Sequence, residues 1–488
     1  MSSSHKNPSH CRGPKVVLIG ASSIFFGRQT IWSMVSKPAL RDGILTLVEV
    51  DSTRLGWVEG LARRAIQASG ANIKLEVSTD YREHLKGADF VILAFAVKGV
   101  ELRDVDATIS TRYGMTMSSG DTIGPGGTFR TLREVPRQAE ILEEVRRVCP
   151  DAWVINWVNP TAAMGIAMMR HFPDLKSIAI CDGPHNPRFE DSLIVQAGLA
   201  PNVQSITPAL RSRTKIRITG VNHFNWLTEM RYEDKDITPR VIEALRQASQ
   251  DHHPIGASED GKVELANKIA SQLASSIGNA PMCIWHTQEY VPYFMGHGIN
   301  KADTFTIKQW RVDLRRKWMN EVWDEMEGLA SGRLPIEPFL ENTRPDHASD
   351  IIETMWTGNG RLYYINMPNN GAVTNMPDDA YLELPTYVEL SGVRPLAYGK
   401  IPRPLTGFIQ RVLDEHELAV EAAVTCDRRI LRQAFLASMV TVNIADVDAC
   451  IDEMLEAERE YIPAGWYKDK EERHSSRSQQ SPRLALAT

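Results

Sequence analysis

Several features that would mark other classes of protein are missing from this sequence. It has no apolar run near the roughly 20 residues that a membrane-spanning helix needs, and its polar beginning, MSSSHKNPSHCRGPK, lacks the apolar core of a secretory signal. Its 55 lysines and arginines face 61 acidic residues, which leaves a formal net charge of −6 and no basic stripe for a phosphate backbone. We therefore expect a soluble cytoplasmic protein with no membrane and no nucleic acid partner.

Cysteine is scarce and scattered. The 488 residues contain six cysteines, and these form no closely spaced set of the kind that staples small secreted domains. We therefore expect reduced thiols, at Cys11, Cys149, Cys181, Cys283, Cys426 and Cys450.

The chain is long enough to bury a large core and to divide into two lobes. Residues 1–13 are polar, and residues 466–488 are mostly polar, so both segments are predicted to be disordered tails. Between them, residues 14–200 alternate short β-branched runs with amphipathic stretches, whereas residues 201–465 mix strands with longer helices. The pattern predicts an α/β fold, in which a doubly wound, Rossmann-like parallel sheet is followed by a mixed α+β lobe that closes over it.

Five apolar runs define the predicted parallel sheet. Each run is short and is separated from the next by enough chain for a helix, such as REVPRQAEILEEVRRV. The predicted strands are KVVLIG, ILTLVEV, DFVILAF, AWVINWV and KSIAICDG.

The first strand leads into VVLIGASSIFF, at the place where such folds carry a G-x-G-x-x-G phosphate loop. Gly20 allows the tight bend, but Ser22 stands where the second glycine lets backbone approach phosphate. Serine can still cap the following helix and donate its hydroxyl. The loop is therefore predicted to hold a pyrophosphate at a helix N-terminus, through Gly20, Ser22, Ser23 and Ile24. An ordinary strand–turn–helix explains this stretch equally well.

Polar residues follow two more of the predicted strands. The second strand ends in TLVEVDSTRL, which brings Glu49 and Asp51 near the place where an acidic side chain accepts the ribose hydroxyls of a dinucleotide. Carboxylates there repel a ribose phosphate, so NAD⁺ is expected rather than NADP⁺. The strand that ends in NWVNPT brings Asn156 and Asn159 to the sheet edge where open α/β folds bind ligands. A plain Asn-Pro turn is an equally good local explanation.

Three later segments carry side chains suited to metal binding or acid–base chemistry. Taken singly, a cysteine is usually a small core residue, and a histidine is more often a surface or core residue than a ligand. The spacing fits no zinc finger, but one thiolate and one imidazole would leave a divalent ion with open positions for a substrate. The segments are ICDGPHN with Cys181, Asp182 and His185, GVNHFNW with Asn222 and His223, and HTQEYVPYF with His286, Glu289, Tyr290 and Tyr293.

These segments stand in one order with GASS, SSGDTIGPGGTFRTLREVP, WVNPTA and INMPNNGAVTNMPDDAYLELP. The series resembles the NAD-dependent family 4 glycoside hydrolases, and most closely their α-galactosidase and related α-glycosidase branch. The resemblance implies hydrolysis of an α-glycoside, the cofactors NAD⁺ and Mn²⁺ or another divalent metal, and assembly into homodimers or homotetramers. It also makes residues 14–200 the NAD-binding domain and residues 201–465 the substrate, metal and oligomerisation domain. An α-galactoside is the first expectation for the substrate, ahead of α-glucosides, hexuronides and phosphorylated glycosides.

The resemblance assigns roles to individual residues near the predicted metal. Cys181 and His223 fall on the metal ligands of the family. Asn159 and Asn222 fall on polar positions that contact the sugar. The family usually has G-A-G-S where this chain has the serine at position 22, which bears on the strength of cofactor binding.

Further roles follow for the acid–base residues. Asp121 and Arg130 fall on a loop that reaches the sugar or the nicotinamide. Tyr290 falls on the tyrosine that acts as the base, with Tyr293 as the alternative. The α-galactosidase and α-glucosidase branches usually place a histidine after the metal cysteine, whereas this chain has Asp182. That aspartate resembles the general acid proposed for the phospho-α-glucosidase branch.

The implied reaction oxidises carbon 3 of the sugar with NAD⁺, which acidifies the proton on carbon 2 and permits elimination of the leaving group. Water then adds, the hydride returns, and the anomeric configuration is retained. One rival is a hydroxyacid dehydrogenase that consumes NAD⁺ stoichiometrically. The other is an NAD-binding regulator without catalytic activity, which would not need a thiolate and an imidazole.

Overall fold

The computed structural model describes residues 13–181, 183–184, 188–250, 262–295 and 307–468. Most of the two predicted tails lies outside these residues. Trp466, however, is only 4% exposed and belongs to a short 3₁₀ helix, Ala464–Tyr467. Folded structure therefore extends past residue 466, because this indole packs into the core. Among the described helices, none combines the length and the apolar character that crossing a membrane requires.

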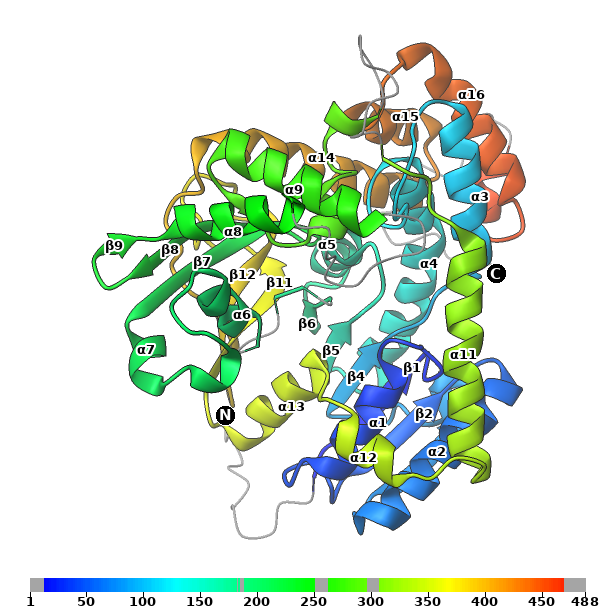
Figure 1. Cartoon of the computed structure of the whole chain (residues 1–488). Coiled ribbons are helices and arrows are strands. Elements are labelled where there is room, and N and C mark those ends of the chain that lie inside the picture. Colours follow the sequence, from blue (N-terminus) through cyan, green and yellow to red (C-terminus); the bar gives the residue numbers. More distant parts are fainter. Residues whose placement is uncertain (1–12, 182, 185–187, 251–261, 296–306, 469–488) are drawn as a thin grey trace.

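The first part of the chain forms a parallel layer (Figure 1). Its spatial order is β3-β2-β1-β4-β5-β6, and every neighbouring pair is parallel. This 3-2-1-4-5-6 order is that of dinucleotide-binding sheets, so the predicted doubly wound topology is confirmed. The strands are β1 (Lys15–Ile19), β2 (Ile44–Val48), β3 (Lys74–Ser78), β4 (Phe90–Leu93), β5 (Trp153–Asn156) and β6 (Lys176–Ala179).

Helices cover both faces of this layer. Val16 and Leu18 of β1 belong to one apolar cluster with residues of the first two helices, whereas Val17 and Ile19 belong to a second cluster on the opposite face. Burial on both faces explains why these strands are continuous apolar runs rather than alternating ones. The helices are α1 (Gly27–Ser36), α2 (Ser52–Ser69), α3 (Gly99–Arg112), α4 (Gly124–Val148) and α5 (Thr161–His171).

The second half of the chain continues the same sheet. β11 pairs antiparallel with β6 through Asn366 and Ala179, and the order then runs β12-β7-β8-β10. With β13 paired to β12 and β9 paired to β8, the sheet has 13 strands in the described part of the chain. The sheet thus crosses the predicted boundary at residue 200, and the division into domains at that point stays a prediction. The added strands are β7 (Thr214–Val221), β8 (Phe224–Tyr232), β9 (Lys235–Asp236), β10 (Ala280–Pro281), β11 (Arg361–Pro368), β12 (Tyr381–Glu389) and β13 (Gly392–Pro395).

Helices of the second half pack back onto the first. Trp32 Nε1 of α1 donates to the Leu340 carbonyl at 2.7 Å, and Lys37 pairs with Asp350 and Glu353 at 2.7 and 2.6 Å. These helices are α6 (Arg188–Gln196), α7 (Pro208–Ser212), α8 (Thr238–Gln250), α9 (Lys262–Ile277), α10 (Ile284–Thr287), α11 (Val312–Ser331), α12 (Glu337–Asn342), α13 (His347–Thr357), α14 (Arg403–Thr425), α15 (Arg428–Ala437) and α16 (Ile444–Ala457). α11 lies along α2, and α14 lies against α4 and α5 (Figure 1).

Candidate active site

The loop after β1 bends sharply at Gly20. This residue has φ +90°, and a Cβ atom there would lie 2.6 Å from the backbone of Ala94, which follows β4. Only glycine fits both constraints. The bend lies where β1 and β4 meet, which is the topological switch point at which sheets of this order bind dinucleotides.

Ser22 does not cap the helix that follows, so this part of the prediction is wrong. α1 begins only at Gly27, and Phe26 occupies its N-cap position without a side-chain cap. Instead, Ser22 Oγ donates to Glu49 Oε2 at 2.6 Å, and the Ser22 backbone N–H donates to the same oxygen at 3.2 Å. The extra loop residues, which include Ser23 and Ile24, separate Ser22 from the helix. Ser22 therefore ties the loop to the end of β2.

Asp51, the other predicted ribose ligand, caps α2. Its Oδ1 accepts from the backbone N–H groups of Thr53 and Arg54 at 3.0 and 3.1 Å. Carboxylate oxygens have lone pairs left after such contacts, so contacts of Glu49 and Asp51 with a ribose stay predictions.

Cys181 and His223 meet at the carboxyl edge of the parallel strands. Cys181 follows β6, and His223 lies in the two-residue turn between β7 and β8, with φ +62°. Cys181 Sγ lies 3.2 Å from His223 Nε2, and the two residues are 5% and 2% exposed. Histidine tolerates positive φ better than most residues, although this backbone conformation is still uncommon. The strained turn aims the imidazole at the thiol, and the structure thus brings together the two predicted metal ligands.

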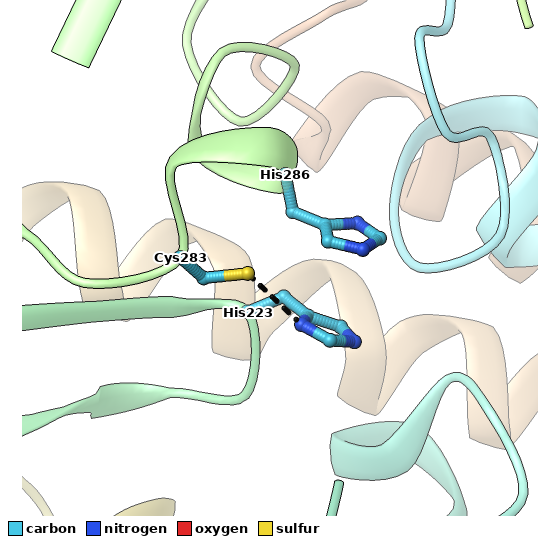
Figure 2. Close-up of side chains that lie close together, drawn as sticks. All are labelled: His223, Cys283 and His286. Carbon is cyan, nitrogen blue, oxygen red and sulfur yellow. Dashed lines mark hydrogen bonds between the residues drawn. The ribbon is translucent and has the colours of Figure 1, made fainter. Parts of the chain in front are cut away.

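Two further residues surround the imidazole of His223 (Figure 2). Cys283 Sγ lies 3.3 Å from His223 Nδ1, and the His286 ring stacks on the His223 ring with centroids 3.8 Å apart and planes 15° apart. The potential ligand atoms of His223, Cys283 and His286 lie within 4.8 Å of one another. His286 lies in one of the segments predicted to suit metal binding or acid–base chemistry, whereas Cys283 was predicted only to be a reduced thiol. The spacing of Cys283 and His286, three residues apart, was the available signal, because such residues share one side of a helical turn.

Asn222 and Asn159 lie next to the Cys181–His223 pair, and their amide groups differ in hydrogen bonding. Asn222 is 2% exposed, and neither atom of its amide has a hydrogen-bond partner in the described part of the chain. Asn159 Oδ1 accepts from the Thr161 hydroxyl at 2.7 Å and lies 3.9 Å from Cys181 Sγ. A buried amide without a partner is rare in native proteins, so Asn222 is the better candidate for binding a polar ligand.

Asp121 is held between two arginines. Arg130 Nη1 lies 3.0 Å and Arg103 Nη1 lies 3.3 Å from Asp121 Oδ2, and Ser119 Oγ donates to Asp121 Oδ1 at 2.8 Å. Burial raises the pKa of this carboxyl, but Arg103 and Arg130 outweigh burial and hold the pKa well below its usual range. Asp121 is therefore an anion that orients these guanidinium groups, and direct contact of Asp121 or Arg130 with a sugar stays a prediction.

Glu289 connects this loop to the histidine cluster. Its Oε2 accepts from the backbone N–H groups of Ser119 and Gly120 at 2.8 and 3.2 Å. Its Oε1 lies 3.5 Å from His286 Nδ1. The carboxylate is fully buried and thus lies between His286 and the loop that carries Asp121.

Tyr290 contacts the β7–β8 turn that carries His223. Its ring stacks on Phe224, with centroids 5.0 Å apart and planes 6° apart, and its hydroxyl donates to the Asn222 carbonyl at 3.2 Å. Burial raises the pKa of this hydroxyl well above its ordinary value, despite the opposing effect of Thr122. The assignment of Tyr290 as the base stays a prediction, and this geometry counts against it. The alternative, Tyr293, is 59% exposed.

Asp182, the predicted general acid, lies outside the described residues, as does His185. In the sequence, Asp182 directly follows Cys181.

Comparison with known proteins gives consistent matches across the chain. The family model described as family 4 glycosyl hydrolase matches residues 15–188, and the model of the C-terminal domain of the same family matches residues 218–441. An α-galactosidase of Rhizobium meliloti (strain 1021) is 25% identical over 462 residues, which cover 92% of this chain and 89% of that protein. An α-galacturonidase of Thermoanaerobacter italicus is 26% identical over 478 residues, which cover 94% of this chain and 99% of that protein.

A solved structure shares the fold. The structure of a 6-phospho-α-glucosidase from gut microorganisms, in complex with NAD and Mn²⁺, superposes with a TM-score of 0.76 at 21% identity. The match covers 92% of this chain and 99% of that one. Because the two models of one family together span most of the sequence, the chain belongs to family 4 of the glycosyl hydrolases.

Proposed function

We propose that this family 4 enzyme hydrolyses an α-glycoside, with an α-galactoside as the preferred substrate, at a site built around Cys181 and His223. Membership of the family makes it a glycoside hydrolase that works with NAD⁺ and a divalent metal. The observation that carries the assignment of the site is the 3.2 Å approach of Cys181 Sγ to His223 Nε2 at the carboxyl edge of the Rossmann-like sheet. The relative named α-galactosidase supports the choice of sugar.

The residues present fit both cofactors. A buried thiol and a buried imidazole nitrogen offer two adjacent donors, and two protein ligands leave a divalent ion with positions for sugar oxygens. The amide of Asn222, next in sequence to His223, has no hydrogen-bond partner among the described residues and offers both a donor and an acceptor to a sugar hydroxyl. At Gly20, the lack of a side chain lets the loop after β1 lie against the Ala94 backbone, at the switch point where sheets of this order bind dinucleotides.

The reaction divides between the bound groups and this chain. When bound, NAD⁺ would accept a hydride from the sugar and later return it, and the divalent ion would supply a Lewis acid for sugar oxygens. Cys181 and His223 would hold the ion against the sugar, and Asn222 would orient a sugar hydroxyl. Asp182, next to Cys181 in the chain, would donate a proton to the leaving oxygen.

A base must remove the proton from carbon 2, and Tyr290 and Tyr293 are the predicted choices. Exchange of the carbon-2 hydrogen with deuterium from the solvent measures this step directly. Loss of that exchange in Tyr290→Phe would assign the role to Tyr290, because the variant keeps the ring that stacks on Phe224. Loss in Tyr293→Phe would assign it to Tyr293.

The proposal is tested with a panel of nitrophenyl α-glycosides, assayed with and without NAD⁺ and Mn²⁺. We expect nitrophenol release to require both additions, many turnovers for each NAD⁺ molecule, and the highest rate with the α-galactoside. Release with neither cofactor would contradict the proposal. Formation of one NADH for each substrate consumed would show a dehydrogenase instead. The cytoplasmic location and the homodimeric or homotetrameric assembly implied by the resemblance stay predictions.

A further inference from the structure

We infer that Cys283 and His286 are positioning residues, which hold the imidazole of His223 so that its Nε2 atom faces Cys181. The inference rests on the proposed function, in which Cys181 and His223 bind the divalent ion. Cys283 contacts the other nitrogen of the His223 imidazole, Nδ1, and His286 stacks on the face of the ring.

The two cysteines contact opposite nitrogens of one ring. Cys181 Sγ lies 3.2 Å from Nε2 of His223, whereas Cys283 Sγ lies 3.3 Å from Nδ1. The lone pairs of the two imidazole nitrogens diverge in the ring plane, so an ion held at Nε2 is not shared with Cys283 through this ring. With its proton on Nδ1, His223 donates to the sulfur of Cys283 and keeps Nε2 as the acceptor for a metal. A partner at the second nitrogen is the usual way in which proteins fix the orientation of a metal-binding histidine.

His286 restrains the ring from its face. Its imidazole is nearly parallel to that of His223, at a centroid distance of 3.8 Å (Figure 2). Imidazole lone pairs lie in the ring plane, so two parallel stacked rings do not aim at one point between them. As they stand, His223, Cys283 and His286 therefore brace the imidazole rather than chelate one ion, although their ligand atoms lie close together.

His286 is in turn contacted by Glu289. Glu289 Oε1 lies 3.5 Å from His286 Nδ1, and Glu289 Oε2 is fixed by the backbone N–H groups of Ser119 and Gly120. His223, by contrast, occupies a strained turn with φ +62°, and strained positions persist only where the surroundings over-determine them. Without Cys283 or the stacked ring, the His223 side chain gains other rotamers and the preformed pair is lost.

Metal affinity provides the test, measured on the full chain with NAD⁺ present. Cys283→Ala removes the acceptor, and we expect the dissociation constant for Mn²⁺ to rise roughly 10- to 100-fold. Cys283→Ser retains an acceptor and should stay close to wild type. Cys450→Ala is the matched control, because it removes a buried thiol on α16, away from the site. His286→Ala should weaken Mn²⁺ binding, and His286→Phe, which keeps a stacked ring, should restore it.

A spectroscopic readout separates positioning from ligation. In the Co²⁺-loaded protein, the thiolate-to-metal charge-transfer band should keep its intensity in Cys283→Ala at saturating Co²⁺ and vanish in Cys181→Ser. A band that falls by half in Cys283→Ala would make Cys283 a ligand and overturn the inference. Unchanged Mn²⁺ affinity in both Cys283→Ala and His286→Ala would also overturn it. If Cys181→Ser itself binds Mn²⁺ as tightly as wild type, the proposed metal site fails, whatever the Cys283 variants do.

Discussion

The buried amide of Asn222 should lower the free energy of unfolding of the ligand-free protein and raise its affinity for the sugar. Neither amide atom has a partner in the residues that the structure describes, and each unsatisfied polar group of this kind costs about 1–3 kcal/mol. Asn222→Leu keeps a similar side-chain volume without the polar atoms. We therefore expect the metal-free and ligand-free variant to unfold at the same urea concentration as wild type or at a higher one. Binding of the sugar should weaken roughly 10- to 100-fold, which corresponds to the loss of about 1.4–2.8 kcal/mol.

Asn156 provides a matched control for this experiment. It is also a buried asparagine near the same sheet edge, but its Oδ1 accepts from Gln138 at 3.3 Å and its Nδ2 donates to the Val158 carbonyl at 2.9 Å. Asn156→Leu leaves these partners unpaired and should lower the free energy of unfolding by about 1–3 kcal/mol. Urea denaturation and inhibition by free galactose measure the two effects. Equal destabilisation by Asn222→Leu and Asn156→Leu, together with unchanged inhibition by galactose, would contradict a ligand-binding role for the Asn222 amide.

Three more variants test the cofactor loop and a buried carboxyl. Gly20→Ala places a Cβ atom 2.6 Å from the Ala94 backbone at φ +90°, so urea denaturation should show a loss of about 3 kcal/mol; wild-type stability would refute the close approach. Ser22→Ala removes the 2.6 Å hydrogen bond to Glu49 and should cost about 1.5–3 kcal/mol. The NAD⁺ dissociation constant, measured by calorimetry, should change little, since Glu49 already engages that hydroxyl; a large rise would assign Ser22 to the cofactor. Burial raises the pKa of Glu415 to about 7 from 4.5, so the stability linked to its neutral form is present below pH 4.5 and is lost as pH rises through 7. Relative to wild type, Glu415→Gln should therefore gain up to about 3 kcal/mol between pH 4.5 and pH 8 in urea denaturation; a constant difference would contradict this pKa.

The parallel sheet was predictable because its strands are buried on both faces. β1, β2, β4, β5 and β6 all fall within the predicted apolar runs. β3 was missed, because as an edge strand it carries Lys74 and Glu76, and only its last residue is buried. A short polar edge strand gives no continuous apolar signal.

The candidate site was predictable to the extent that motifs identify single residues. Cys181 and His223 were paired from the sequence, and the structure places them in contact. The Cys283–His286 spacing indicated two residues on one side of a helical turn, but not that they contact His223. Those contacts, and the place of Tyr290, depend on how side chains pack around the β7–β8 turn. The partner of Ser22 was likewise unpredictable, because Glu49 lies on another strand and meets the loop only in the folded sheet.

The most direct test of the account is Mn²⁺ reactivation of the metal-stripped enzyme, with NAD⁺ and nitrophenyl α-galactoside held constant. We expect wild type to recover nitrophenol release as Mn²⁺ is added, and Cys181→Ser and His223→Ala to recover little at the same concentrations. Full recovery by either variant at the wild-type Mn²⁺ concentration would show that this thiol and imidazole do not hold the catalytic metal.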